Sequence, residues 1–239
     1  MSSLVLVRHG QASFFADDYD QLSPLGEEQS RHLARYWIER GVTFDEVFTG
    51  PRARQRRTEE LVAETFREAG NSWPLAETAA EFDEYDLGGI TTRLLPACIE
   101  SDERLAALAR QHSASTEPRE KLRNFQAMFE VLMTAWIGLS DTIEGVESWE
   151  AFQQRVARGL DRLTRREGRS RRIVVFTSGG FIGAAVQSVL AAPNGAALEL
   201  NWRVRNTAVS EILFTESRRS LDSFNSVAHL PKTELVSYR

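Results

Sequence analysis

The chain has 239 residues, of which 42% are hydrophobic and 26% charged, and its formal net charge is −5. These values predict one large folded domain, or a domain with an insertion, and they give no global case for binding nucleic acid or an anionic membrane. The single cysteine excludes an intrachain disulfide. Without a signal peptide or a run of about 20 apolar residues, we expect a cytoplasmic protein.

The N-terminal part of the chain alternates predicted strands and helices. The apolar run LVLV over 4–7 predicts a short buried strand. Ser23-Pro24 suits the N-cap and first turn of a helix that we expect to end at Gly41. A second strand is predicted over 44–49, and Gly50-Pro51 separates it from another helix. This alternation is typical of a parallel sheet with helical crossovers.

Residues 92–147 depart from the alternation. Apolar residues recur there at helical spacing, and a loop over 113–118 divides them. We interpret the segment as a helical cap inserted into a single α/β domain that spans 1–239. Its methionine and aromatic stripe is expected to form core rather than a ligand pocket.

Strands and helices alternate again after the insertion. Ser148 is the expected N-cap of a helix, and a buried strand over 173–177 leads into another helix over 181–191. Two further strands are predicted over 209–214 and 221–227. We therefore predict a three-layer α/β/α fold with a mostly parallel central sheet.

Arg8, His9 and Gly10 directly follow the first predicted strand. Open α/β sheets bind ligands at the carboxyl edge of their strands. An imidazole can act as a nucleophile or carry a proton near neutral pH, and a guanidinium matches phosphate with a planar fork of donors. We favour this function over a surface arginine with a structural histidine, and the motif indicates covalent phosphoryl chemistry.

The second predicted strand leads into the start of a helix at TGPRAR, residues 49–54. The free N–H groups and partial positive charge of a helix N-terminus favour phosphate, and Arg54 can add bidentate contacts. For Arg56 and Arg57 we favour a solvated basic face.

A third strand end carries Ser178-Gly179-Gly180. A serine hydroxyl and backbone N–H groups at a helix start can bind phosphate oxygens, and the alternative is an ordinary glycine-rich turn. The acidic loop over 81–86 adds a further candidate function, because a carboxylic acid with a raised pKa can protonate a leaving alkoxide. Four acids lie in that loop, and their spacing does not choose among them.

Together these motifs resemble the histidine phosphatase superfamily, also called the phosphoglycerate mutase-like family. The resemblance covers most of the chain outside the predicted cap, with six motifs in the family's order. They are LVRHGQAS, LSPLGEEQ, TGPRARQRRTEE, FDEYDLGG, GVESWEAFQQRV and IVVFTSGGFI.

The resemblance implies a reaction through phosphohistidine. It implies His9 as the nucleophile, and it selects Glu84 as the acid that protonates the leaving group and later acts as base. The implied phosphate-binding residues are Arg8, Arg54, Gln11, Ser178 and Gly179, of which the two arginines are also catalytic. No metal and no organic cofactor is implied.

The sequence departs from the family pattern at several positions. The family's second histidine falls on Ser178, which keeps a hydroxyl donor but loses the imidazole. A charge-assisted hydrogen bond contributes about 1.5–3 kcal/mol, so the change predicts a rate lower by roughly one to two orders of magnitude. Phe15 replaces a common asparagine, and Gly50 and Gln55 replace the usual serine and alanine. The short acidic segment before Leu22 disfavours mutase activity.

The leading hypothesis is a phosphomonoester hydrolase that acts through His9 on a small phosphorylated molecule. Ser178 and Phe15 motivate an alternative, a non-catalytic or weakly active relative that binds a phosphorylated ligand. Phosphoglycerate mutase-type transfer is a further alternative. Binding of nucleic acid through the basic stretches 52–57 and 165–172 has the least support, and we expect no membrane partner. The substrate and the oligomeric state stay open, a homodimer being one alternative.

Overall fold

The computed structural model describes residues 1–13, 20–139, 143–165 and 170–238. The chain divides into two compact units. The α/β unit comprises Met1–Glu84 and Arg155–Arg239, and the helical unit comprises Tyr85–Gln154. The segment predicted as a cap, 92–147, lies within the helical unit. Its function as a cap stays a prediction.

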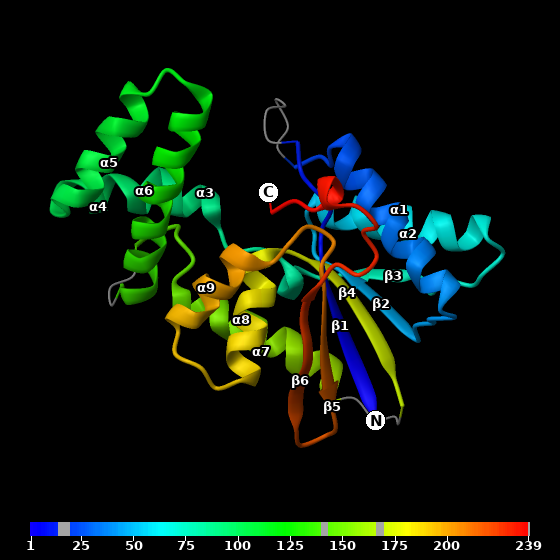
Figure 1. The fold of residues 1–239 in the computed structure, drawn as a ribbon. Coiled ribbons are helices and arrows are strands. Elements are labelled where there is room, and N and C mark those ends of the chain that lie inside the picture. Colours follow the sequence, from blue (N-terminus) through cyan, green and yellow to red (C-terminus); the bar gives the residue numbers. More distant parts are fainter. Residues whose placement is uncertain (14–19, 140–142, 166–169, 239) are drawn as a thin grey trace. The chain divides into compact units, whose positions relative to one another are not determined.

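The α/β unit contains a six-stranded sheet (Figure 1). Its strands are β1 (Ser2–Arg8), β2 (Glu46–Thr49), β3 (Ala76–Thr78), β4 (Arg172–Thr177), β5 (Val209–Phe214) and β6 (Arg219–Ser226). Their order across the sheet is β3-β2-β4-β1-β5-β6. The strands β3, β2, β4 and β1 are parallel to one another, whereas β5 is antiparallel to both β1 and β6. This topology confirms the predicted, mostly parallel sheet.

The two strands at the centre of the sheet, β1 and β4, are buried over nearly their whole length. Parallel strands that are covered on both faces have continuous apolar sequences, which explains the two apolar runs of the chain. Arg8 at the end of β1 pairs with Thr177 at the end of β4. The residues that follow them, His9 and Ser178, therefore leave the sheet at the same edge.

Helices cover both faces of this sheet (Figure 1). They are α1 (Pro24–Glu39), α2 (Ala53–Glu68), α7 (Trp149–Thr164) and α8 (Gly179–Val189), and α9 (Gly195–Arg203) packs against α8. Successive side chains of a strand point to opposite faces. Val47 packs in one core cluster with Trp37 of α1 and Phe66 of α2. Its neighbour Phe48 faces α7 instead, with its ring centroid 5.7 Å from the guanidinium carbon of Arg162. These layers confirm the predicted three-layer α/β/α fold.

Some predicted elements have different ends, and two elements were not predicted. The second strand begins at Glu46 rather than at residue 44, and α8 begins at Gly179 rather than at residue 181. The sequence analysis missed β3 and α9. Three residues are too few to show the alternation of a strand. The first residue of α9 is the glycine of a proline–asparagine–glycine sequence, which is typical of a turn.

The helical unit contains a short α3 (Leu87–Gly89), a π-helical turn over Ile90–Leu94, α4 (Leu95–Ser101), α5 (Glu103–Ala114) and α6 (Pro118–Gly138). Its core is aromatic. The ring of Trp136 lies 5.4 Å from that of Tyr85 and 5.3 Å from that of Trp149, and its Nε1 donates to the carbonyl of Glu147 at 2.8 Å. The methionines and aromatic residues near the end of α6 are buried, so they form core as expected. Among the described residues, no helix combines the length and apolar character that crossing a bilayer requires.

Candidate active site

His9 is the first residue after β1, and it is only 5% exposed. Its backbone is held on both sides. The N–H group donates to the carbonyl of Thr177 at 2.9 Å, and the carbonyl accepts from Nδ2 of Asn206 at 3.2 Å. Asn206 is itself buried, and its Oδ1 accepts from the hydroxyl of Ser237 at 2.9 Å. These contacts fix the backbone that carries the imidazole.

The hydrogen bonds of the His9 ring define its tautomer. Nδ1 lies 2.7 Å from the carbonyl oxygen of Gly10, which can only accept, so Nδ1 carries the proton. Nε2 lies 3.1 Å from Nε of Arg54, which can only donate, so Nε2 presents its lone pair. Nε2 is therefore the ring atom with nucleophilic character.

The surroundings of His9 keep the imidazole neutral. Burial lowers the pKa of His9 well below its ordinary value, and the positive charges of Arg54 and Arg8 lower the pKa further. Low-dielectric surroundings and nearby cations both disfavour the protonated ring. At neutral pH Nε2 therefore carries no proton, and in this structure its lone pair accepts from Nε of Arg54.

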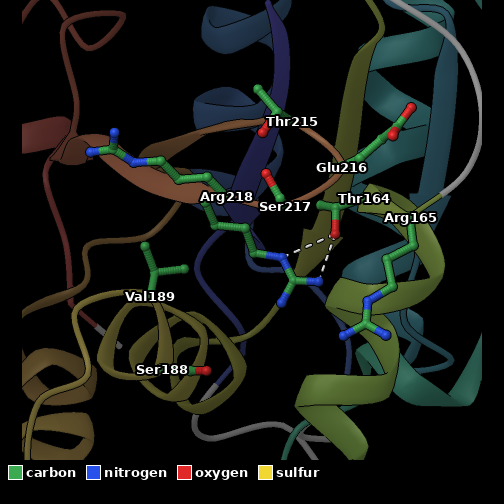
Figure 2. Close-up of a pocket in the computed structure, with 9 residues that line it drawn as sticks. Thr164, Arg165, Ser188, Val189, Thr215, Glu216, Ser217 and Arg218 are labelled. Atoms are coloured by element: carbon green, nitrogen blue, oxygen red, sulfur yellow. Dashed lines mark hydrogen bonds between the residues drawn. The ribbon is translucent and has the colours of Figure 1, made fainter.

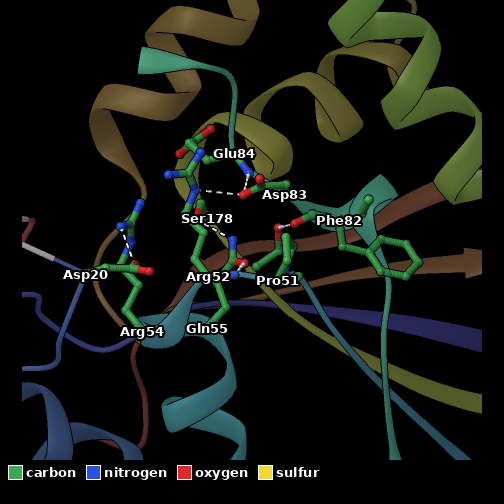
Figure 3. A network of polar contacts seen from close by, with 12 residues as sticks. Asp20, Pro51, Arg52, Arg54, Gln55, Phe82, Asp83, Glu84 and Ser178 are labelled. Atoms are coloured by element: carbon green, nitrogen blue, oxygen red, sulfur yellow. Dashed lines mark hydrogen bonds and ion pairs between the residues drawn. The ribbon is translucent and has the colours of Figure 1, made fainter. Parts of the chain in front are cut away.

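Arg54 lies in the first turn of α2 and is 7% exposed. Its Nη1 pairs with Oδ1 of Asp20 at 2.8 Å, and Oδ2 of Asp20 accepts from the N–H group of Ala53, also at 2.8 Å (Figure 3). Arg54 and the start of α2 thus hold an anion, here a carboxylate of the chain itself. The sequence analysis did not identify Asp20, because one acid in a polar loop has no distinctive pattern.

Arg8 is the last residue of β1, and its Nη1 donates to the carbonyl of Val204. Its guanidinium carbon lies 3.7 Å from the position that a Cβ atom on Gly179 would occupy. The same Cβ would lie 2.5 Å from Oδ1 of Asn201. Gly179 therefore allows the start of α8 to approach these neighbours closely.

Glu84 is the acid of the predicted loop whose carboxylate contacts α8. Its Oε2 accepts from the N–H group of Gly180 at 3.1 Å. Its own N–H group donates to Oδ1 of Asp83 at 2.7 Å, and its carbonyl accepts from Arg155 at 3.1 Å. The loop backbone is thus fixed on both sides of this side chain.

The other acids of the loop have different partners. Glu81 pairs with Arg162 at 3.2 Å, and Asp83 pairs with Arg52 at 2.7 Å. Asp86 accepts from the N–H group of Gly89 as the N-cap of α3. The partners of these carboxylates, distant in the chain for Glu81, Asp83 and Glu84, therefore distinguish four acids that look equivalent in the sequence. Within the described ranges, no group of three or more His, Cys, Asp or Glu side chains is placed to hold a metal ion.

Ser178 is fully buried, and its Oγ accepts from Nε2 of Gln55 at 2.7 Å. Gln55 is also fully buried, and its Oε1 accepts from the N–H group of Arg52 at 3.0 Å (Figure 3). The sequence analysis treated Gln55 as a mild departure from the family pattern. Its position in the first turn of a helix, where glutamine can bond back to the N-cap, is the signal that could have marked it.

Gln11 connects the loop after β1 to the start of α1. Its Oε1 accepts from the hydroxyl of Ser23 at 2.9 Å, and its N–H group donates to Oε1 of Gln29 at 3.0 Å. The oxygen of the Gln11 side chain is therefore engaged in local structure, and its role in phosphate binding stays a prediction. Phe15, the other departure noted in this loop, lies outside the described residues.

His229 lies behind the site, where it supports the segment that contacts His9. Its Nε2 lies 2.8 Å from the hydroxyl of Thr207, and that hydroxyl donates to the carbonyl of Asn206 at 2.7 Å. Burial and, to a smaller extent, the charge of His32 lower the pKa of His229 to about 4.

The protein should lose stability as the pH falls below the ordinary histidine pKa of 6.5, because the unfolded chain then binds a proton that folded His229 resists. With a folded pKa of about 4, His229 should account for a loss of about 2 kcal/mol between neutral pH and about pH 5. Urea unfolding at neutral pH and at about pH 5 measures this loss in the free energy of unfolding. His229→Gln should reduce the loss by that amount, and His112→Gln, at a partly exposed histidine, should not. Equal losses in wild type and His229→Gln would contradict the assignment.

A cavity of about 260 Å³ lies elsewhere in the α/β unit (Figure 2). It is lined by residues from α7, α8 and the turn between β5 and β6, including Thr215 and Arg219. Because Ser2 pairs with Phe214, this turn lies at the sheet edge opposite to His9. Arg219 donates to Thr164 at 3.0 Å. The cavity is thus separate from the candidate active site.

Comparison with curated proteins finds enzymes of phosphoryl chemistry. The chain is 35% identical over 97 residues to a 2,3-bisphosphoglycerate-dependent phosphoglycerate mutase of Nitratidesulfovibrio vulgaris, a match that covers 38% of this chain and 37% of that protein. It is 41% identical over 69 residues to a 2-carboxy-D-arabinitol-1-phosphatase of Triticum aestivum, covering 26% and 14%. These matches span well under two thirds of either relative's length.

Solved structures match over almost the whole chain. Phosphoglycerate mutase from Bacillus anthracis superposes with a TM-score of 0.64 at 18% identity, covering 95% of this chain and 94% of that one. A phosphoserine phosphatase from Entamoeba histolytica, in complex with phosphoserine, superposes with a TM-score of 0.60 at 15% identity, covering 96% and 100%. At these identities the likeness shows the fold alone.

A sequence profile of one family matches both the N-terminal and the C-terminal parts of the chain. The matched segments are residues 4–138 and 127–227, which include His9, Arg54 and Ser178. The two segments together cover most of the chain, and the fold agrees with the match. The chain therefore belongs to the histidine phosphatase superfamily (branch 1).

Proposed function

We propose that the protein is a phosphomonoester hydrolase that forms a phosphohistidine on Nε2 of His9. The observation that carries this proposal is the state of the His9 ring, which is buried and neutral, with Nε2 directed at Arg54 at 3.1 Å. Membership of a superfamily that includes phosphatases and mutases supports the same chemistry.

In the first step Nε2 of His9 attacks the phosphorus atom of the substrate. The N–P bond forms while the bond from phosphorus to the leaving oxygen breaks, and the carboxylic acid of Glu84 gives its proton to that oxygen. Arg8 and Arg54 stabilise the negative charge on the phosphoryl oxygens, because preorganised cations in a site that excludes water act strongly on a charged transition state.

In the second step a water molecule attacks the phosphorus atom of the phosphohistidine. Its proton goes to the carboxylate that Glu84 became in the first step. The N–P bond breaks, inorganic phosphate leaves, and His9 returns to its neutral form with the lone pair on Nε2. One residue thus serves as acid and then as base, and the covalent intermediate divides one difficult displacement into two easier ones.

The substrate we propose is a small phosphorylated molecule. The likeness to a phosphatase that was solved with phosphoserine supports a ligand of this size. The net charge of −5 gives no general support for binding nucleic acid, whereas Arg8 and Arg54 lie near His9, where they can meet a single phosphoryl group.

A trapping experiment tests the proposed function. The protein is quenched during reaction with 32P-labelled candidate substrates, chosen from sugar phosphates, phosphoglycerates, nucleotides and phosphoserine. We expect protein-bound label that is labile in acid and stable in alkali, together with release of inorganic phosphate. The absence of label and release with every substrate would overturn the proposal, and label that returns to phosphoglycerate would favour mutase-type transfer.

A non-catalytic role in binding a phosphorylated ligand is the second candidate function. The observation that favours it is Ser178, a fully buried neutral hydroxyl at the position where the family pattern has its second histidine. This candidate predicts phosphate binding without turnover, and it predicts that Ser178→His creates hydrolysis. Multiple turnovers by the natural chain would exclude it.

Glu84→Gln should reduce hydrolysis according to the leaving group. For an alkyl phosphate we expect kcat to fall by roughly 100- to 10,000-fold, the usual contribution of a general acid. For p-nitrophenyl phosphate the first step should fall much less, because its leaving group needs no proton. Single-turnover rates with both substrates measure the difference. Glu81→Gln, in the same loop but paired with Arg162, is the control, and equal losses with both leaving groups would argue against this role.

A further inference from the structure

The contacts of Gln55 fix the orientation of its amide. The N–H group of Arg52 lies 3.0 Å from one end of that amide, and a backbone N–H can only donate. The oxygen of Gln55 must therefore face Arg52. The nitrogen then faces Ser178, at 2.7 Å from its Oγ.

This orientation determines what the Ser178 hydroxyl can do. An amide nitrogen can only donate, so Oγ of Ser178 must accept from Gln55. The proton of the hydroxyl consequently points elsewhere. Within the part of the chain that the structure describes, Gln55 is the one side chain that bonds to this fully buried oxygen. The hydrogen bond from Gln55 therefore leaves the proton of the Ser178 hydroxyl free to be donated to another group.

The fold leaves room for this contact at Gly50. A Cβ atom there would lie 2.2 Å from Oε1 of Gln55 and 2.6 Å from the carbonyl oxygen of Phe82. Any larger residue at position 50 would therefore displace Gln55. The three departures from the family pattern, Gly50, Gln55 and Ser178, are thus neighbours in space and depend on one another.

The hydroxyl lies among the groups of the candidate site. Ser178 follows the strand end beside His9, and the next two residues approach the other site groups. The start of α8 at Gly179 lies against the guanidinium of Arg8, and the N–H group of Gly180 donates to Glu84. Ser178 therefore leaves the sheet at the same edge as His9, next to backbone that contacts Arg8 and Glu84.

We propose that Gln55 is a positioning residue that holds the Ser178 hydroxyl as a donor to a phosphoryl oxygen bound beside His9. The inference rests on the phosphate site of the proposed function but not on turnover. The Gln55–Ser178 pair replaces the donor function of an imidazole with two neutral groups that do not titrate.

Calorimetric titration with inorganic phosphate tests this proposal in a double-mutant cycle of Gln55→Met and Ser178→Ala. Ser178→Ala should weaken phosphate binding by roughly ten- to a hundredfold, the range for a hydrogen bond to a charged group. Gln55→Met should weaken it by about threefold or more, because the hydroxyl then rotates freely. In the Ser178→Ala background, Gln55→Met should add nothing. Gln187→Met, at another buried glutamine near the end of α8, is the matched control.

A pH comparison separates positioning from a structural role. In Gln55→Glu the ionised carboxylate can only accept, so it turns the Ser178 proton away from the phosphate. The ratio of wild-type to variant affinity should therefore be large at about pH 8 and should shrink toward about pH 5, as protonation restores a donor. When Ser178 is replaced by alanine, there is no hydroxyl proton to turn. The Gln55→Glu substitution should then change the pH dependence of phosphate affinity by less than it does when Ser178 is present. If Gln55→Met does not fold, the cycle is completed with Gln55→Glu.

The outcomes distinguish this inference from the proposed function. Non-additive losses support the positioning role, even in a chain that never hydrolyses a substrate. Additive losses in the cycle, or a wild-type chain that does not bind phosphate, overturn it. Turnover together with additive losses would leave the proposed hydrolase intact and reject the role of Gln55.

Discussion

Replacement of His9 by alanine should abolish the acid-labile phosphoprotein and lower kcat/KM by at least about four orders of magnitude. The proposed mechanism has no other nucleophile, and the neighbouring cations alone cannot form the covalent intermediate. Phosphate binding should persist in this variant, since Arg8 and Arg54 remain. Quench-flow labelling and steady-state assays measure both effects.

The control for this experiment is His112→Ala, which removes a partly exposed imidazole in the helical unit. It should retain wild-type labelling and turnover. Substantial activity in His9→Ala would show that the reaction proceeds by direct attack of water or at another residue. Loss of folding is excluded by comparing the urea midpoints of the two variants.

Arg54→Lys should lower kcat/KM by roughly 100- to 1,000-fold, the usual effect of removing one preorganised donor from a charged transition state. The substitution keeps the positive charge. It removes the planar fork with which Arg54 contacts His9 through Nε and Asp20 through Nη1. Steady-state kinetics should show the main loss in kcat rather than in KM.

Arg57→Lys is the matched control, because Arg57 lies on the same helix and pairs with Glu60 and Glu64 on its partly exposed side. It should leave kcat/KM within about twofold, as expected for a solvated ion pair. Equal losses in the two variants would contradict a specific role for the guanidinium geometry of Arg54.

The sequence allowed prediction of the sheet edge that carries the site. LVLV and the apolar run before Ser178 are continuous because both strands are covered on both faces, and such runs end where the ligand edge begins. The order of strands and helices followed from the same periodicity. Ser23 also accepts from the N–H group of Gly26, as predicted for an N-cap.

The polar contacts of the site could not be predicted in the same way. Glu84 differs from Asp83 only by the partners that distant segments bring to each carboxylate. Gln55 and Ser178 are 123 residues apart in the chain, and their contact depends on the space left at Gly50. Local patterns do not contain such information, because it arises only when separate elements pack.

The guanidinium of Arg155 joins the two places where the chain leaves and re-enters the α/β unit. It donates to the carbonyl oxygens of Asp83, at 2.8 Å, and of Glu84, at 3.1 Å. The residues of the α/β unit that precede and follow the helical unit are therefore connected directly by these two hydrogen bonds. A segment inserted between such closed ends can change in length or sequence, or be exchanged for another, without altering the register of the sheet. The same two hydrogen bonds hold the backbone of Glu84, the proposed acid, at the last residue before the helical unit.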